Sequence, residues 1–132
     1  MDTIFTKIIN GEIPCFKIAE NDHFFAFLDI SPLAKGHTLV IPKNQIDYIF
    51  NLDDQTLADL MIFAKKIAKA IEINIPCQRI GIAVIGLEVP HTHIHLIPIN
   101  AVGDINFKNE RVMVTTDEMA KLALVISQSV NL

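Results

Sequence analysis

The decisive stretch of this sequence is His91-Thr92-His93-Ile94-His95-Leu96-Ile97-Pro98, in which three histidines alternate with other residues. Successive side chains of a β-strand point to opposite faces of a sheet, so positions i, i+2 and i+4 share one face. The pattern therefore predicts a strand over residues 89–99 with three imidazoles on one surface. Neighbouring imidazoles resist joint protonation, and such a row is typical of a site that binds a metal ion or an anion.

Two chemistries are open for this row. In a regular strand the outer histidines, His91 and His95, stand roughly 13 Å apart, which is too far for both to bind one ion. Two of the histidines together with a remote carboxylate or with His37 would still form a metal site. Alternatively, His93 acts as a nucleophile toward phosphorus while its other ring nitrogen donates to a fixed acceptor. His91 and His95 would then bind phosphate oxygens and pass a proton to the leaving group.

Composition limits the class of protein. The chain has 132 residues, of which 51% are hydrophobic and 20% charged, as in a single globular domain. Its net charge of −4 provides no positive field for a nucleic-acid polymer. No stretch approaches the roughly 18 apolar residues of a membrane span, and the first residues do not resemble a signal peptide. Cys15 and Cys77 stand far apart, which is typical of a reducing compartment. We therefore expect a cytoplasmic protein that binds neither nucleic acid nor membranes.

Hydrophobic periodicity predicts an α+β domain. Apolar residues spaced by three and four between positions 57 and 71 predict an amphipathic helix, and Thr115 with Glu118 forms a capping box for a last helix through about residue 127. Residues 5–9 predict one helical turn. Residues 79–85 look buried on both faces, which is typical of a central strand. Other strands are expected at 16–19, 24–28, 37–42 and 111–114.

Two further blocks, residues 4–14 and 26–43, accompany the triad in a characteristic order and spacing. On these three blocks, which cover residues 4–99, the sequence resembles the histidine triad (HIT) superfamily, and within it the Hint branch of purine nucleoside phosphoramidases. The resemblance implies a HIT-like α+β fold with a mostly antiparallel five-stranded sheet and two main helices, which forms a homodimer. We expect a HIT domain over residues 4–103 and a C-terminal strand and helix extension over 104–132.

The resemblance also implies roles for particular residues. His93 would form a covalent nucleotidyl-histidine intermediate, His95 and His91 would assist at the phosphate, and His37 would be the remote histidine beside the triad. Asp29 would bind the ribose hydroxyls of an AMP-type nucleotide; capping the loop before Ser31 is its alternative role. The apolar walls of the base pocket, which are alternatively plain core residues, would be Phe5, Ile8, Phe27 and Ile30. No cofactor is expected.

The sequence departs from the family pattern at two places. Many bacterial relatives hold a structural zinc ion at positions that here read Thr3, Thr6 and Gln45, so we predict no metal there. The loop of residues 86–90 is shorter than the phosphate loop of relatives, and Glu88, followed by Val89, replaces its hydroxyl residue. A carboxylate at Glu88 would repel a phosphate, point to solvent or contact a cationic leaving group.

These observations predict a nucleotide hydrolase or transferase that cleaves a P–N or P–O bond at the α-phosphate of a purine nucleotide. One alternative is a nucleotide-binding regulatory module without catalysis, and another is a histidine-ligated metalloenzyme. The pattern leaves open whether residues 111–132 cover the pocket or extend a dimer.

Overall fold

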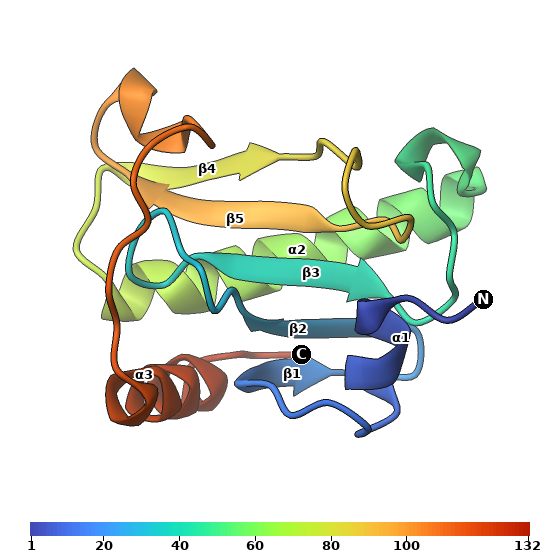
Figure 1. Cartoon of the computed structure of the whole chain (residues 1–132), viewed down its shortest axis with the longest axis horizontal. Helices are drawn as coiled ribbons and strands as arrows, with labels where there is room; N and C mark the ends of the chain where they lie inside the picture. Colours follow the sequence, from blue (N-terminus) through green and yellow to red (C-terminus); the bar gives the residue numbers. More distant parts are fainter.

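The protein is an α+β domain built on one antiparallel sheet, and a computed structural model describes all 132 residues. The strands are β1 (Lys17–Glu20), β2 (Phe24–Leu28), β3 (Thr38–Pro42), β4 (Arg79–Ala83) and β5 (Ile94–Ile99). They lie in the order β1-β2-β3-β5-β4 (Figure 1). The predicted fold class and the five-stranded antiparallel sheet are therefore confirmed.

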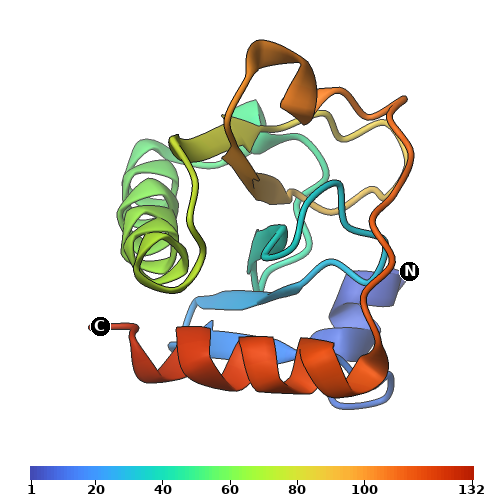
Figure 2. The ribbon, with the colours of Figure 1, turned by 90° about the vertical axis from the view of Figure 1, so that its left-hand side faces the viewer.

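Three α-helices flank the sheet. They are α1 (Ile4–Ile9), α2 (Asp54–Asn74) and α3 (Thr116–Gln128), and two short 3₁₀ turns, η1 (Ile49–Asn51) and η2 (Val102–Ile105), lie in the connections. The helices α2 and α1 cover opposite faces of the sheet, and α3 runs beside β1 (Figure 2). Asp53 caps α2 by accepting a hydrogen bond from the Thr56 N–H at 2.7 Å, and Thr115 caps α3 as predicted.

Strand alternation divides the core into two layers. In β2, Phe24, Ala26 and Leu28 face α2 and α3, whereas Phe25 and Phe27 face α1. The pairing of β2 with β3 continues into the loops that flank these strands. Phe27 pairs with Leu39, and the Asp29 N–H donates to the His37 carbonyl oxygen at 2.9 Å. Asp29, His37 and Leu39 are thereby placed on the α1 face of the sheet.

The strands predicted at 79–85 and 111–114 differ from the structure. The strand at 79–85 ends at Ala83 and is an edge strand, because β4 pairs only with β5 and its residues are exposed or half-buried. Apolar composition alone does not reveal whether a second neighbouring strand exists. Residues 111–114 form no strand at all. This segment crosses the α1 face of the sheet, where the Val112 N–H donates to the Pro32 carbonyl oxygen at 2.9 Å.

None of the helices combines the length and the apolar character that crossing a membrane demands.

Candidate functional site

A cavity of about 560 Å³ opens on the α1 face of the sheet. Its walls come from α1, from the loop after β2, from residues 85–89, from the triad and from the segment that follows η2. The sequence-predicted site residues that line it are Phe5, Ile8, Phe27, Asp29, Ile30, Glu88, Val89, His93 and His95. The two remaining predicted residues, His37 and His91, are fully buried behind this wall.

The three triad histidines do not form the regular row that strand alternation predicts. The strand β5 begins only at Ile94, so His91 and His93 precede it. His95 pairs with Leu39 of β3 and faces the cavity. The ring of His93 lies 5.1 Å from the ring of His95 and 5.0 Å from the ring of Phe5, measured between centroids. Two of the three imidazoles therefore share the cavity.

His93 is held in one tautomer. Its Nδ1 atom lies 2.7 Å from the carbonyl oxygen of His91. A carbonyl oxygen only accepts hydrogen bonds, so Nδ1 carries the proton and Nε2 of the neutral ring keeps a free lone pair. The side chain is almost entirely buried, at 7% exposure, but lines the cavity. This arrangement is the one that a histidine nucleophile requires.

His91 has no free ring nitrogen. Its Nε2–H donates to the Pro42 carbonyl oxygen at 2.8 Å, and its Nδ1 accepts from the Thr3 hydroxyl at 3.0 Å. Burial lowers the pKa of His91, which keeps the ring neutral. The expected direct contact of His91 with a phosphate is therefore not available in this structure. Instead, its carbonyl oxygen positions the ring of His93.

The residues that replace the zinc ligands of relatives lie together beside His91. The Thr6 hydroxyl donates to Oε1 of Gln45 at 2.8 Å, and Gln45 also accepts from the Thr3 N–H at 3.3 Å. Zinc sites in proteins use thiolates, imidazoles and carboxylates. Hydroxyl and amide groups, beside an imidazole whose nitrogens are both engaged, do not fit a structural zinc ion.

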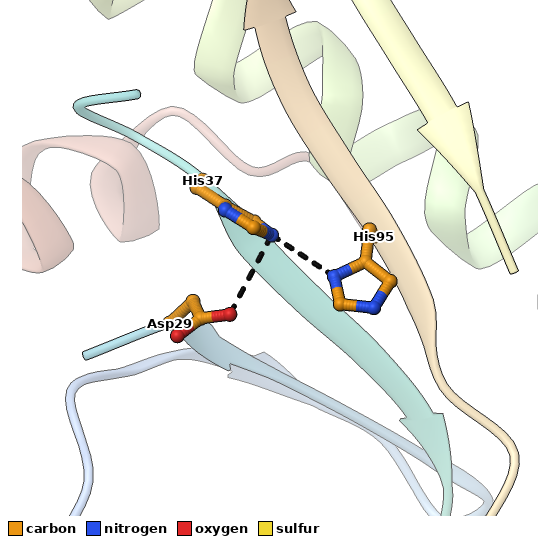
Figure 3. A group of neighbouring side chains, drawn as sticks. All are labelled: Asp29, His37 and His95. Atoms are coloured by element: carbon orange, nitrogen blue, oxygen red, sulfur yellow. Dashed lines mark hydrogen bonds and ion pairs between the residues drawn. The ribbon is translucent and has the colours of Figure 1, made fainter. Parts of the chain in front are cut away.

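His37 and His95 form a hydrogen-bonded pair next to Asp29 (Figure 3). The Leu33 N–H donates to Nδ1 of His37 at 3.0 Å, so the proton of His37 is on Nε2. This Nε2–H donates to Nδ1 of His95 at 3.0 Å and lies 3.5 Å from Oδ2 of Asp29. Consequently the proton of His95 is on Nε2. Burial lowers the pKa of His37 to about 3 and that of His95 to about 4, so both rings are neutral near pH 7.

These three side chains are also the candidate metal ligands of the chain. Their donor atoms all lie within 4.8 Å of one another, as the alternative with two histidines and a carboxylate requires. However, Nδ1 of His37 already accepts a hydrogen bond, so its Nε2 would have to lose its proton to bind a metal. A neutral imidazole has only one unprotonated nitrogen, so His37 cannot accept a hydrogen bond at Nδ1 and bind a metal through Nε2 at the same time. The contacts therefore favour a hydrogen-bonded chain over a metal centre.

Asp29 contacts both the loop and the site. Its Oδ1 accepts from the Ser31 N–H at 2.8 Å, which is the predicted loop cap, while the other oxygen faces His37. Burial raises the pKa of this carboxyl group above its usual value. The two alternatives that the sequence left open are thus compatible with each other.

Among the cavity-wall residues that sequence reasoning missed are Phe107 and Arg111. The ring of Phe107 lies 4.7 Å from the ring of His95 and 6.2 Å from the ring of His37. The guanidinium of Arg111 lies 5.6 Å from the Phe107 centroid and donates to the Ser31 carbonyl oxygen at 3.2 Å. No local pattern reveals a contact between residues 80 positions apart. The segment after η2 therefore covers the cavity, the first of the two roles left open for residues beyond 110.

The fold is that of a known class of proteins. The family model described as "HIT domain" matches residues 10–102 of the chain. The chain therefore belongs to the HIT family.

Individual relatives extend this result. The chain is 38% identical to an uncharacterised HIT-like protein of Borreliella burgdorferi, with 98% of this chain and 99% of the relative covered. It is 44% identical to adenosine 5'-monophosphoramidase hnt1 of Schizosaccharomyces pombe, with 74% of each chain covered. A Hit-like protein from Bartonella henselae has a similar structure, with a TM-score of 0.82, 30% identity, and coverage of 98% of this chain and 97% of that one.

Proposed function

We propose that the protein hydrolyses a purine nucleotide of the AMP type at its α-phosphate, with His93 as the nucleophile. The observation that carries this proposal is the hydrogen bond from Nδ1 of His93 to the His91 carbonyl oxygen, because it leaves Nε2 free to attack. The similarity to a protein named adenosine 5'-monophosphoramidase supports the same class of reaction.

In the first step, Nε2 of His93 forms a bond to phosphorus while the bond from phosphorus to the leaving group breaks. The leaving group departs with the electron pair of that bond. If its nitrogen is already protonated in the substrate, it leaves as a neutral amine and needs no proton from the protein. The Nε2–H of His95 donates a hydrogen bond to a phosphoryl oxygen and stabilises the charge that develops there.

In the second step, water attacks the phosphorus of the nucleotidyl-histidine. The bond to Nε2 of His93 breaks, and its electron pair returns to the ring. One hydrogen of the water passes to solvent as a proton, and the other stays on the product phosphate or is released to solvent as well. His93 is then neutral again and its Nδ1–H is unchanged.

The neutral histidine pair favours cleavage of a P–N bond over a P–O bond. An alcohol leaving group needs a proton donor, and a neutral imidazole whose pKa is lowered to about 4 is a poor one near pH 7. A leaving amine that is already protonated needs no proton donor from the protein. Glu88 lines the same cavity, and its carboxylate is suited to a cationic leaving group.

The remaining predicted residues would hold the nucleoside. Asp29 presents carboxylate oxygens for the ribose hydroxyls at the edge of the cavity. The base would lie between the apolar side chains that line the cavity, which are Phe5, Ile8, Phe27, Ile30 and Val89. Ile30 is 78% exposed in the free protein, and a bound base would cover part of its surface.

The test is release of AMP from adenosine 5'-phosphoramidate with a chelator present throughout. We expect turnover by the unmodified protein, none by His93→Ala, and unchanged turnover by His23→Ala, whose side chain is exposed and outside the cavity. Binding of AMP without any turnover would support the regulatory module instead. Activity that the chelator removes would support the metalloenzyme.

We further propose that the protein is a homodimer in which β4 forms part of the interface. An edge strand has unpaired backbone groups, and on this one the side chain of Ile82 is 48% exposed. Val84 and Ile85 continue this exposed apolar surface. Light scattering should give twice the mass of the chain, and Ile82→Lys should give a monomer, whereas Leu124→Lys on α3 should not. A monomeric unmodified protein would contradict the proposal.

A further inference from the structure

The cavity is lined by few permanently charged groups. Asp29 and Glu88 contribute carboxylates, and the only lysine or arginine in the wall is Arg111. His95 is neutral near pH 7 because burial lowers the pKa of its ring. A nucleotide monophosphate brings negative charge into this space. Its phosphate therefore requires a cation, and the cavity offers one guanidinium.

Arg111 has donors to spare. A guanidinium carries five N–H groups. Arg111 donates one hydrogen bond to the Ser31 carbonyl oxygen at 3.2 Å and a long one, 3.5 Å, to the Phe107 carbonyl oxygen. It takes part in none of the ion pairs of the chain. Its positive charge also acts within the site, where it opposes the burial that raises the pKa of Asp29 and adds to the burial that lowers the pKa of His37 and of His95.

The guanidinium is held in position before any ligand binds. On one side it packs over the ring of Phe107, whose other contacts are His95 and His37. On the other side the neighbouring Val112 N–H is hydrogen-bonded to the Pro32 carbonyl oxygen at 2.9 Å. Since both the side chain and the backbone are fixed, little conformational entropy is lost when an anion binds.

The usual source of phosphate contacts in the family is weak in this chain. The loop of residues 86–90 has no hydroxyl side chain and carries Glu88 instead. The segment after η2 crosses the same face of the sheet (Figure 2), and Arg111 of this segment lines the cavity.

We propose that Arg111 is a substrate-binding residue that contacts the phosphate oxygens of the nucleotide, and that residues 107–112 thereby replace the missing loop contacts. The proposal rests on the proposed function, because it assumes that a nucleotide occupies this cavity. Under this proposal, residues 107–112 select phosphorylated over unphosphorylated nucleosides. This segment lies outside residues 10–102, the part of the chain that the HIT domain model matches.

The test compares AMP with adenosine, which lacks the phosphate. Affinities are measured by NMR titration, which detects millimolar binding, for the unmodified protein and for Arg111→Gln, Arg111→Lys and Lys66→Gln. Lys66 is exposed on α2, outside both the cavity and the proposed interface, and controls for the loss of one positive charge. We expect Arg111→Gln to weaken AMP about tenfold or more and to leave adenosine unchanged. Arg111→Lys should retain most of the AMP affinity, and Lys66→Gln all of it.

The other outcomes separate this inference from the proposed function. If Arg111→Gln binds AMP as tightly as the unmodified protein, Arg111 is not a phosphate ligand although the proposed function stands. If AMP and adenosine weaken together, Arg111 has only a structural role and the inference is wrong. If the unmodified protein prefers AMP no more than adenosine, the phosphate contact does not exist. If it binds neither, both proposals fail.

Discussion

The Nε2 atom of His37 lies 3.0 Å from Nδ1 of His95, and this hydrogen bond joins residues that are 58 positions apart. It exists because β3 pairs with β5 and because the Leu33 N–H occupies the other nitrogen of His37. The bond sets the tautomer of His95 and directs its remaining proton away from His37. His95, which lines the cavity, is therefore oriented by His37, which does not line it.

The neutral histidines should make stability depend on pH. The folded-state pKa values of His37 and His95 are lowered to about 3 and about 4, from 6.5. Below pH 6.5 the unfolded chain therefore binds protons that the folded chain does not, and the free energy of unfolding decreases as the pH falls. Between about pH 6 and pH 5 the slope should approach about 1.4 kcal/mol per pH unit for each ring. The raised pKa of Asp29 acts in the opposite direction.

Urea denaturation at pH 7, 6, 5 and 4.5 measures this slope. In His37→Asn the slope should be smaller by about the contribution of one ring, even if the variant is less stable at every pH. A free energy of unfolding that is constant across this range would show that the buried rings are not neutral in the folded state.

Phe107→Ala should change the acidity of His95. Desolvation is the main cause of the lowered pKa of His95, and the Phe107 ring covers it at 4.7 Å. Without this ring, water reaches the imidazole and its pKa should rise toward 6.5. Phe107 lies outside both hydrophobic core clusters, so the fold should persist. An NMR titration of the histidine ring protons checks the shift, and an unchanged pKa would mean that the strands alone exclude water.

Thr3→Ala should destabilise the protein more than Thr115→Ala. Each threonine caps a helix through its hydroxyl, and removing such a cap costs about 1 kcal/mol. Thr3 also donates to Nδ1 of the fully buried His91, so its loss leaves that nitrogen without a partner. We expect an additional cost of about 1–3 kcal/mol. Denaturant unfolding of the two variants measures this difference. Equal losses of unfolding free energy would show that the contact of Thr3 with His91 contributes nothing to stability.

Glu88→Gln should alter the choice of leaving group. A carboxylate in the cavity wall attracts a cationic leaving group and repels an anionic one. The variant should lose kcat/KM with a nucleotide whose leaving amine carries an extra positive charge, and it should lose less with simple adenosine 5'-phosphoramidate. Glu110→Gln, which lies outside the cavity, is the matched control. No change with either substrate would mean that Glu88 points to solvent, and an equal loss with both would mean that it does not act on the leaving group.

Gly36→Ala should cost more stability than Gly11→Ala. Both glycines have positive φ angles, +95° and +79°, which are unfavourable for alanine. At Gly36 the new methyl group would also lie 3.0 Å from Cγ1 of Ile75, whereas nothing lies within 4 Å at Gly11. We expect a difference of about 1 kcal/mol or more between their unfolding free energies. Thermal and urea unfolding measure this difference. Equal losses of stability in the two variants would mean that the Ile75 side chain moves aside without an energetic cost.

Much of the fold follows from local patterns in the sequence. A run of aromatic and apolar residues after a polar turn predicts β2 with its exact bounds, and apolar spacing predicts the core of α2, because both patterns arise from the local geometry of a single strand or helix. The three histidines and the two blocks that accompany them carry the resemblance to the HIT family, and that resemblance implies a nucleotide site. Of the three histidines that alternation places on one face, His93 and His95 line one cavity, whereas His91 does not.

Tertiary structure alone decided the rest. The pairing of β4 with a single neighbour makes it an edge strand, and a local run of apolar residues carries no information about neighbours. His91 turns away from the cavity because Thr3 and Pro42, both distant in sequence, satisfy its two nitrogens. Arg111 reaches the cavity because the chain after η2 crosses the sheet to Ser31. Short-range periodicity determines which elements form, whereas contacts across many residues determine which side chains meet.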